Sequence, residues 1–268
     1  MASVRVLLLR AAGINCEEET AYAWRLAGAS TEIFHVKELI AEPARLERCQ
    51  VVVAPGGFSY GDDIASGRIL AHQLSRHLGD AMRRFVDRGG LLLGICNGFQ
   101  ALVKAGLLPG GAFAGRVTLA LNDSARYEDR WVHVTSGGRA SPFLRPGQTL
   151  RLPVAHGEGK VVTDSPETLA ALAAQGHVVL TYGDASGRPG PYPINPNGSE
   201  GNIAGLIDAT GRILGLMPHP ERAVDPTHLP DATRRAVRGR TGGAAVCDLP
   251  EGPGMAIFRN AVAALTED

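Results

Sequence analysis

The sequence predicts an α/β fold: a doubly wound, mostly parallel sheet flanked by helices, with extra antiparallel strands. Two observations lead to this prediction. In the first hundred residues, short and nearly continuous apolar runs alternate with helical segments, a pattern typical of parallel strands buried on both faces. From about residue 116 onward, the pattern changes to short strands separated by turn residues, which favours antiparallel pairing.

The first half supplies the parallel strands and three helices. The predicted strands are Val4–Leu9, Glu32–Val36, Val51–Ala54 and Leu91–Ile95. The first helix begins at "NCEEETAYAWRLAG", where Asn15 is expected to cap, Glu18 to close a capping box and Gly28 to end the helix. Ile64–Arg88 is predicted as a long amphipathic helix and Gly98–Ala105 as a shorter one.

The second half is richer in turns. The expected elements are a strand, turn and strand over Arg116–Thr135 with its turn at 121–130, further strands in Leu150–Thr163 and His177–Tyr182, a loop over 183–202, a hairpin of Ile203–Asp208 with Ile213–Met217, and a final helix Met255–Leu265. Residues 222–254 are polar and turn-rich, with a helix expected near 231–238. No repeat or linker divides the chain, so we expect a single domain over residues 1–268, with 222–254 as a polar insertion.

Composition narrows the class of protein. Lys+Arg and Asp+Glu both total 27, and the lysines are only Lys37, Lys104 and Lys160, which argues against a nucleic-acid partner. The N-terminus has no signal-peptide cleavage pattern, and no apolar stretch approaches the roughly 18 residues of a membrane span. The four cysteines are far apart without a CxxC pair or zinc spacing, which indicates a cytoplasmic protein without a metal site.

The segment "GGLLLGICNGFQAL" places Cys96 between a predicted strand and a predicted helix. This arrangement follows the nucleophile elbow, with a thiol in the place of the serine hydroxyl. Gly94 and Gly98 are expected to let the backbone turn sharply and substrate approach the sulfur. The N–H groups that begin the helix would lower the pKa of the thiol and stabilise an oxyanion. The alternative is a packed cysteine at a glycine-rich turn.

A base and its partner are predicted in "GLMPHPER". His219 follows a buried strand between two prolines, and Glu221 is two residues later, so both side chains point the same way in an extended segment. A carboxylate in that place can orient one imidazole, as in a catalytic triad. The alternative is a structural histidine beside an exposed glutamate.

A third candidate is the Gly56–Gly57 turn in "VVVAPGGFSYGDD". Its backbone could present an N–H to an oxyanion and complement the N–H of Asn97. Asp62 and Asp63 are interpreted as caps of the following helix rather than as metal ligands.

The remaining thiols and one histidine are weaker candidates. Cys16 lies in the first turn of a helix, where three adjacent glutamates disfavour a thiolate, and Cys49 and Cys247 are interpreted as structural. For His156 in "AHGEG", a pocket loop and a plain turn are equally compatible with the sequence.

These motifs together resemble a known family. "PGGFSYGD", "GICNGFQ", "NPNGS" and "MPHPER", with "AGINCEEE" and "ARYEDRW", resemble the class I (triad) glutamine amidotransferases, and within them the glutaminase subunits of phosphoribosylformylglycinamidine synthases. The resemblance runs from about residue 4 to 222 and resumes over the final helix. The stretch 222–254 departs from it by being longer than in the shorter members.

The resemblance implies roles for individual residues. Cys96 matches the nucleophile that attacks the glutamine amide, His219 the base and Glu221 its orienting partner. Gly57 and Asn97 match the oxyanion donors, with Gly56 as the alternative to Gly57. A further matched position is Gln100, which the family uses to hold the glutamine.

The resemblance also implies a reaction and partners. L-glutamine would be hydrolysed through a thioester, and ammonia would pass to a larger synthetase subunit that uses ATP and Mg²⁺ on formylglycinamide ribonucleotide, with a small bridging subunit. This chain itself would need no cofactor. The alternatives are the glutaminase of another class I amidotransferase, a thiol hydrolase of the α/β-hydrolase or protease type, and a scaffold subunit without activity.

Overall fold

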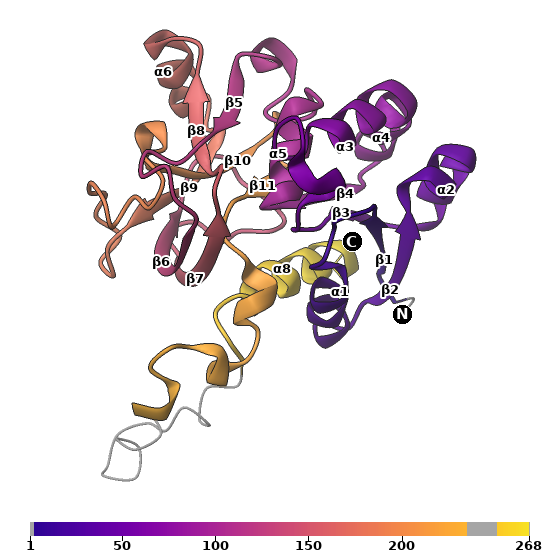
Figure 1. The fold of residues 1–268 in the computed structure, drawn as a ribbon. Coiled ribbons are helices and arrows are strands. Elements are labelled where there is room, and N and C mark those ends of the chain that lie inside the picture. Colours follow the sequence, from indigo (N-terminus) through magenta and orange to yellow (C-terminus); the bar gives the residue numbers. More distant parts are fainter. Residues whose placement is uncertain (1–2, 235–250, 268) are drawn as a thin grey trace.

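A mixed nine-stranded sheet is the centre of the computed structural model, which describes residues 3–234 and 251–267 (Figure 1). Its strand order is β2-β1-β3-β4-β11-β10-β9-β6-β7. The strands are β1 (Arg5–Arg10), β2 (Ser30–His35), β3 (Val51–Ala54), β4 (Leu91–Ile95), β6 (Glu128–Ser136), β7 (Thr149–His156), β9 (Val178–Gly183), β10 (Ile203–Ile207) and β11 (Ile213–Leu216).

One half of the sheet is parallel. β2, β1, β3, β4 and β11 pair in parallel, and every residue of β3 and β4 is buried. This confirms the prediction from the apolar runs, because strands covered by helices on both faces need no polar face. The edge strand β2 begins earlier than predicted and ends at His35, whose side chain caps a short helix, α2 (Val36–Ala41).

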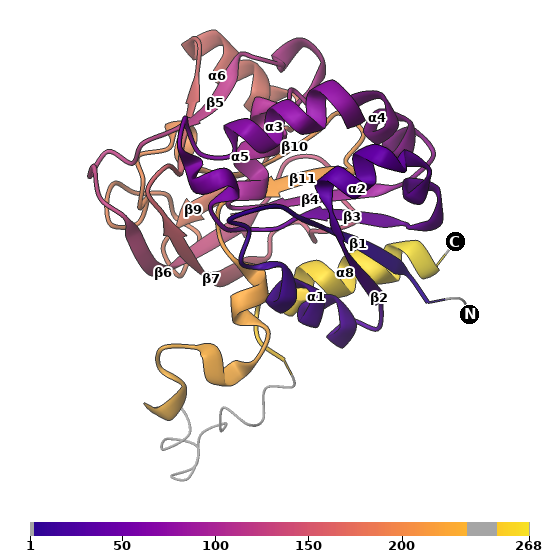
Figure 2. The ribbon, with the colours of Figure 1, turned by 45° about the vertical axis from the view of Figure 1, so that its right-hand side comes forward.

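Helices cover both faces of the parallel half. α1 (Glu17–Leu26) and α8 (Met255–Thr266) lie together on one face, where Trp24 and Phe258 meet edge to face with ring centroids 5.3 Å apart (Figure 2). The helices α3 (Arg68–Gln73), α4 (Gly79–Asp87) and α5 (Asn97–Lys104) lie on the other face. The doubly wound arrangement is therefore confirmed.

Two predicted helix starts are wrong. Cys16, not Asn15, is the N-cap residue of α1, and its side chain makes no capping bond. The Asn15 side chain accepts the thiol hydrogen of Cys16 instead, and Glu18 is bound to Arg10.

The predicted helix Ile64–Arg88 begins only at Arg68. Gly67 adopts a left-handed φ of 71°, because the Asp62 carboxylate binds its N–H and closes the preceding loop. Beyond α3, a π-helical turn over Leu74–Leu78 leads into α4.

The other half of the sheet is antiparallel. β10 pairs with β11 as the predicted hairpin, and β9, β6 and β7 extend the sheet beyond it. β6 begins at Glu128, so part of the predicted turn 121–130 is strand. A separate pair, β5 (Val117–Ala120) with β8 (Lys160–Thr163), lies near α6 (Pro166–Ala174), a helix that we did not predict.

After β11, a 3₁₀ turn at Pro220–Ala223 is buried in the body. Beyond it the chain projects from the body up to residue 234 and includes a second 3₁₀ turn, Pro226–His228 (Figures 1 and 2). Residues 232–234 are helical, and the rest of the helix expected near 231–238 lies outside the described residues.

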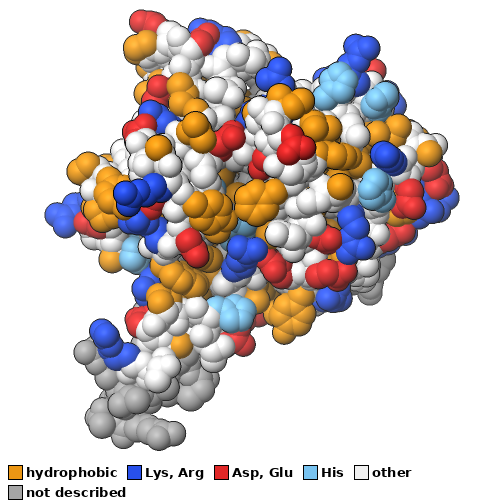
Figure 3. All heavy atoms as spheres, viewed as in Figure 1, with side chains coloured by type: hydrophobic (Ala, Val, Ile, Leu, Met, Phe, Trp, Pro, Cys, Tyr) orange, Lys and Arg blue, Asp and Glu red, His pale blue; other side chains and the backbone are white. Residues whose placement is uncertain are grey.

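No described helix combines the length and apolar character needed to cross a bilayer. On the face shown in Figure 3, basic and acidic side chains are interspersed.

Candidate active site

The candidate site lies where four parallel strands end. The loops after β1, β3, β4 and β11 carry Cys16, Gly57, Cys96 and His219, and the carboxyl edge of an open α/β sheet is where ligands bind. A cavity of about 130 Å³ opens between them. It is lined by Asn15, Cys16, Gly57, Phe58, Cys96, Tyr127, Ala155, His219 and Arg222.

Cys96 itself makes the sharp turn between β4 and α5. Its φ of 49° and ψ of −106° are far from the ordinary regions for a residue with a side chain. The backbone is fixed there because the Cys96 N–H binds the Leu216 carbonyl at 2.8 Å and the Gln100 N–H binds the Cys96 carbonyl at 3.1 Å. The thiol points into the cavity toward the Ala155 carbonyl, 3.7 Å away.

The glycines around Cys96 act differently from our prediction. Gly94 lies in β4 and Gly98 in α5, and neither has a positive φ. A Cβ on Gly94 would lie 2.9 Å from the Phe99 nitrogen, and one on Gly98 would overlap the Ala54 carbonyl. They are therefore needed for close packing of α5 on β4 and β3, while the turn falls on the cysteine.

His219 and Glu221 form the predicted pair. Nδ1 of His219 lies 2.6 Å from Oε1 of Glu221, and both side chains are almost fully buried. The His219 N–H binds the Pro153 carbonyl at 2.8 Å, which holds the turn against β7. Nε2 of His219 is buried with no hydrogen-bond partner among the described residues, so it is the nitrogen free to exchange a proton.

The surroundings of His219 favour its charged form. Burial alone would lower the pKa of His219, but the negative charge of Glu221 and the nearby Cys96 and Cys16 thiols raise it well above its ordinary value of 6.5. The site can therefore hold an imidazolium beside a thiolate, which is the pair that a cysteine nucleophile needs.

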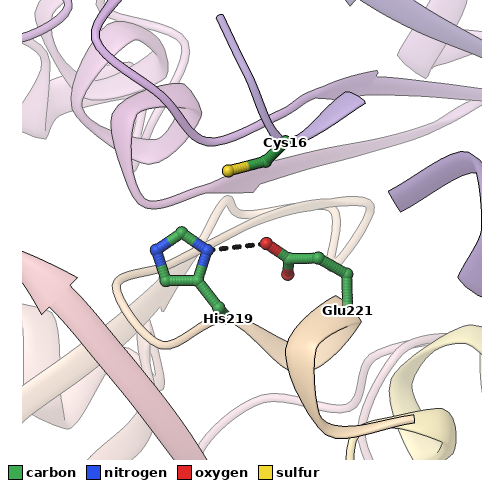
Figure 4. Close-up of side chains that lie close together, drawn as sticks. All are labelled: Cys16, His219 and Glu221. Atoms are coloured by element: carbon green, nitrogen blue, oxygen red, sulfur yellow. Dashed lines mark hydrogen bonds and ion pairs between the residues drawn. The ribbon is translucent and has the colours of Figure 1, made fainter. Parts of the chain in front are cut away.

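Cys16 joins this group, as the sequence did not predict (Figure 4). Its sulfur, a His219 nitrogen and a Glu221 oxygen all lie within 4.8 Å of one another. Within the described residues this is the one cluster of three potential metal ligands, but His219 and Glu221 are already bound to each other. Asp62 and Asp63, for which metal binding was the less favoured interpretation, belong to no such cluster among the described residues.

Of the two predicted alternatives for the first oxyanion donor, only Gly57 lines the cavity. Gly57 lines the cavity with a φ of 139°, whereas Gly56 packs against the edge of the His219 ring. Asn97 is the first residue of α5, so its N–H has no acceptor within the helix.

Gln100 is buried in α5. Its side chain accepts a hydrogen bond from Asn97 Nδ2 at 3.0 Å and donates one to the Glu158 carbonyl. It is not among the residues that line the cavity, so a contact with substrate would require it to exchange a partner.

A network of hydrogen bonds holds the loop between β3 and α3 against α5. The Asn97 side chain accepts the Ser59 N–H at 3.1 Å and donates to Asp62 at 3.0 Å. Lys104 donates to the Ser66 carbonyl at 2.8 Å, and burial lowers the pKa of its ammonium group. Asp62 therefore ties the loop together rather than capping α3.

The remaining candidates lie in structural positions. His156 is buried, with Nδ1 3.1 Å from Asn122 Oδ1, and burial together with the charge on His219 lowers its pKa to about 3. Cys49 packs partly buried against the core, and burial raises its pKa to about 11. Cys247 lies outside the described residues.

Several cavity residues were missed from the sequence: Asn15, Cys16, Phe58, Tyr127, Ala155 and Arg222. Cys96 directly follows β4, whereas Cys16 comes six residues after the end of β1, so the sequence carried no equally local signal for Cys16. Phe58 and Tyr127 come from loops far apart in the chain, and their rings stack with centroids 6.4 Å apart.

Comparisons with known proteins identify the family of the chain. The model of the CobB/CobQ-like glutamine amidotransferase domain matches residues 3–263. The chain is 44% identical over 265 residues to the phosphoribosylformylglycinamidine synthase subunit PurQ of Dehalococcoides mccartyi, covering 98% of both chains. It is 40% identical over 263 residues to the subunit of that name from Methanococcus maripaludis, covering 96% of both.

Solved structures share the fold of this chain. In the structure of PurLQS from Thermotoga maritima, one chain matches with a TM-score of 0.69 and 27% identity, over 99% of this chain and 100% of that one. A glutamine amidotransferase from the same organism shares the fold, with a TM-score of 0.53 and 17% identity over the whole of both chains.

Proposed function

The chain belongs to the CobB/CobQ-like glutamine amidotransferase family, and from this premise we propose that its site hydrolyses L-glutamine with Cys96 as the nucleophile. It is a glutamine amidotransferase of the phosphoribosylformylglycinamidine synthase type, acting in purine biosynthesis. The observation that carries the proposed chemistry is the strained Cys96 thiol facing one small cavity together with the buried His219–Glu221 pair.

The reaction begins with the thiol proton moving to Nε2 of His219. The Cys96 sulfur attacks the side-chain amide carbon of glutamine, and the N–H groups of Gly57 and Asn97 stabilise the negative oxygen of the tetrahedral intermediate. The imidazolium returns the proton to the amide nitrogen, which leaves as ammonia. A γ-glutamyl thioester remains, and water activated by neutral His219 hydrolyses it to glutamate and free thiol.

Glu221 and Gln100 support these steps without reacting. The Glu221 carboxylate keeps the imidazole in one tautomer and stabilises its positive form. Gln100 would hold the glutamine only after its amide leaves the Glu158 carbonyl, to which it is bound in this structure.

We further propose that the ammonia is consumed outside this chain. A larger synthetase subunit would use ATP and Mg²⁺ to convert formylglycinamide ribonucleotide to the amidine, a small subunit would bridge the two, and the complex would be cytoplasmic. The similarity to a chain in PurLQS supports a synthetase partner.

The Cys96→Ala variant tests the proposal. In the assembled synthase it should abolish glutamine-dependent synthesis while ammonia-dependent synthesis continues, and it should prevent labelling by a glutamine-analogue affinity reagent. Loss of both activities would indicate a structural role for Cys96. Intact glutamine-dependent activity would show that another group is the nucleophile.

A further inference from the structure

Cys16 is a second thiol in the cavity that the proposed reaction does not use. It is 1% exposed and shares the cavity with Cys96 and His219. In Figure 4 its sulfur points at the imidazole ring of His219 from the side opposite the backbone of that residue. A role of Cys16 toward His219 rests on the proposed glutaminase function, since His219 is the base of that reaction.

The backbone of Cys16 is fixed from both sides. Its N–H binds the Gly56 carbonyl at 3.3 Å. Its carbonyl accepts the N–H of Thr20 at 3.0 Å and the Thr20 hydroxyl at 2.6 Å, as the first turn of α1 begins. These bonds fix the backbone of Cys16, so the point from which its side chain extends toward the ring is set by α1 and the Gly56–Gly57 turn.

The sulfur is also fixed by its own hydrogen bonds. Nη2 of Arg222 donates to Cys16 Sγ at 3.1 Å, and the thiol donates to Asn15 Oδ1 at 3.2 Å. Arg222 is held in turn by Glu19, with Nε 2.7 Å from Oε1. Burial raises the pKa of the Cys16 thiol, so it stays a neutral thiol rather than a competing nucleophile.

The Cys16 sulfur lies beside the ring, within 4.8 Å of a His219 nitrogen. An ideal Cβ on Gly56 would lie 2.8 Å from Cε1 of His219 and 3.1 Å from Sγ of Cys16. Gly56 and Cys16 thus bound the ring at its Cε1 edge, while Glu221 holds Nδ1. The ring has little room to rotate away from the nucleophile.

We propose that Cys16 is a positioning residue of the glutaminase reaction: held by Arg222 and Asn15, its thiol packs against His219 and keeps Nε2 directed at Cys96. A misplacement of about 1 Å of a catalytic group costs up to roughly a hundredfold in rate. A role of this kind therefore affects kcat, while the binding of glutamine stays unchanged.

The contact between Cys16 and His219 also has a pH signature. The ionisable groups around His219 are Glu221 and Arg222 on its own turn, Cys16 before α1, Cys96 before α5, His156 at the end of β7 and Tyr127 in the loop before β6. Cys16 is one of those that raise the pKa of His219. Its removal should move the alkaline limb of kcat/KM to lower pH, because the imidazolium that protonates the departing amide nitrogen is lost sooner.

The test compares Cys16→Ala with Cys16→Ser in the assembled synthase. Cys16→Ala should lower glutamine-dependent kcat roughly tenfold or more, leave KM within about twofold, and shift the alkaline limb to lower pH. Cys16→Ser should recover much of the loss, because a hydroxyl also accepts from Arg222 and donates to Asn15. Cys49→Ala is the matched control, since Cys49 lines a different cavity beside Arg5 and Arg48.

Wild-type kcat and pH profile in Cys16→Ala would overturn the inference, as would a serine variant no better than the alanine variant. If Cys16→Ala does not fold, Arg222→Gln removes the donor that holds the sulfur and should lower kcat in the same way. An unchanged kcat in that variant also overturns the inference. Failure of the proposed function would appear separately, as glutamine-dependent activity that survives Cys96→Ala.

Discussion

Cys96 is held in a conformation that is costly for a residue with a side chain, on the order of 1–3 kcal/mol. It is maintained because its N–H is bound to β11 and its carbonyl to α5, so the thiol cannot relax without breaking the sheet or the helix. The strained turn brings the sulfur and the first N–H groups of α5 to one point in the cavity. A packing cysteine would gain nothing from this strain, which favours a reacting group.

At the same scale, the charge of Glu221 raises the pKa of His219. We expect Glu221→Gln to lower kcat for glutamine roughly 10²- to 10⁴-fold, because a neutral amide fixes the imidazole less well and does not stabilise its positive form. The alkaline limb of kcat/KM should move to lower pH, since the charge that raises the pKa of His219 is gone. A pH–rate profile of the assembled synthase measures both effects.

Glu167→Gln is the matched control for this prediction, because Glu167 is an exposed residue in the first turn of α6. It should leave the rate and the profile unchanged. An alkaline limb that stays in place in Glu221→Gln would contradict the assigned role of the carboxylate.

The three residues of the proposed triad could be picked out from the sequence, because each lies in a local pattern. Cys96 follows a buried strand within a glycine pattern, and Glu221 follows His219 by two residues. Cys16 carried no comparable pattern. Its contact with His219 depends on the loop after β1 crossing over the Gly56–Gly57 turn, where Ile14 and Gly57 form an isolated bridge. Such a crossing is a property of the tertiary fold.

At the scale of elements, the site depends on how closely α5 approaches β3. Gly98 allows this approach, because a Cβ there would overlap the carbonyl of Ala54. We expect Gly98→Ala to lower the free energy of unfolding by about 1–3 kcal/mol, as overpacking does, and to displace the N-terminus of α5 that presents Cys96. Urea unfolding and labelling by a glutamine analogue measure the two effects.

Gly137→Ala is the control for that substitution. Gly137 follows β6, does not have a positive φ, and a Cβ there would meet no atom within 4 Å. The change should leave stability equal or slightly higher, because alanine restricts the unfolded chain. If Gly98→Ala were equally harmless, the close approach of α5 to β3 would not be what positions the nucleophile.

Elements were predicted best where the sequence pattern alone determines them. The runs that became β3, β4 and β11 are buried on both faces, so a short apolar run identifies them. The start of α3 could not be predicted, because it depends on the hydrogen bond that the Gly67 N–H donates to the Asp62 carboxylate. The helix α6 was overlooked although Ser165 caps it and Pro166 begins it, both ordinary start signals.

At the scale of the whole molecule, the two halves of the sheet meet at the site. β7 is the last strand of the antiparallel half, yet its Pro153 carbonyl binds the His219 N–H and its Ala155 carbonyl lies beside the Cys96 thiol. The antiparallel half must therefore curl back toward the end of β4, as the twist of a large sheet allows. This explains why Cys96 and His219 both contact a strand that is far from β4 in sheet order.

That closure also buries His156, the last residue of β7, and predicts how the fold responds to acid. The pKa of His156 is about 3 in the folded chain and 6.5 when unfolded, so between these values the unfolded state binds the proton more readily. The contribution of neutral His156 to the free energy of unfolding is therefore fully present above pH 6.5. It is lost as the pH drops toward 3, by up to several kcal/mol at about 1.4 kcal/mol per pKa unit. His156→Gln should flatten the dependence of unfolding free energy on pH between about 6.5 and 4, measured by urea unfolding.

His77→Gln, at an exposed position before α4, is the control and should keep the wild-type slope. An unchanged slope in His156→Gln would show that another buried group, and not the closure over His156, makes the fold sensitive to acid.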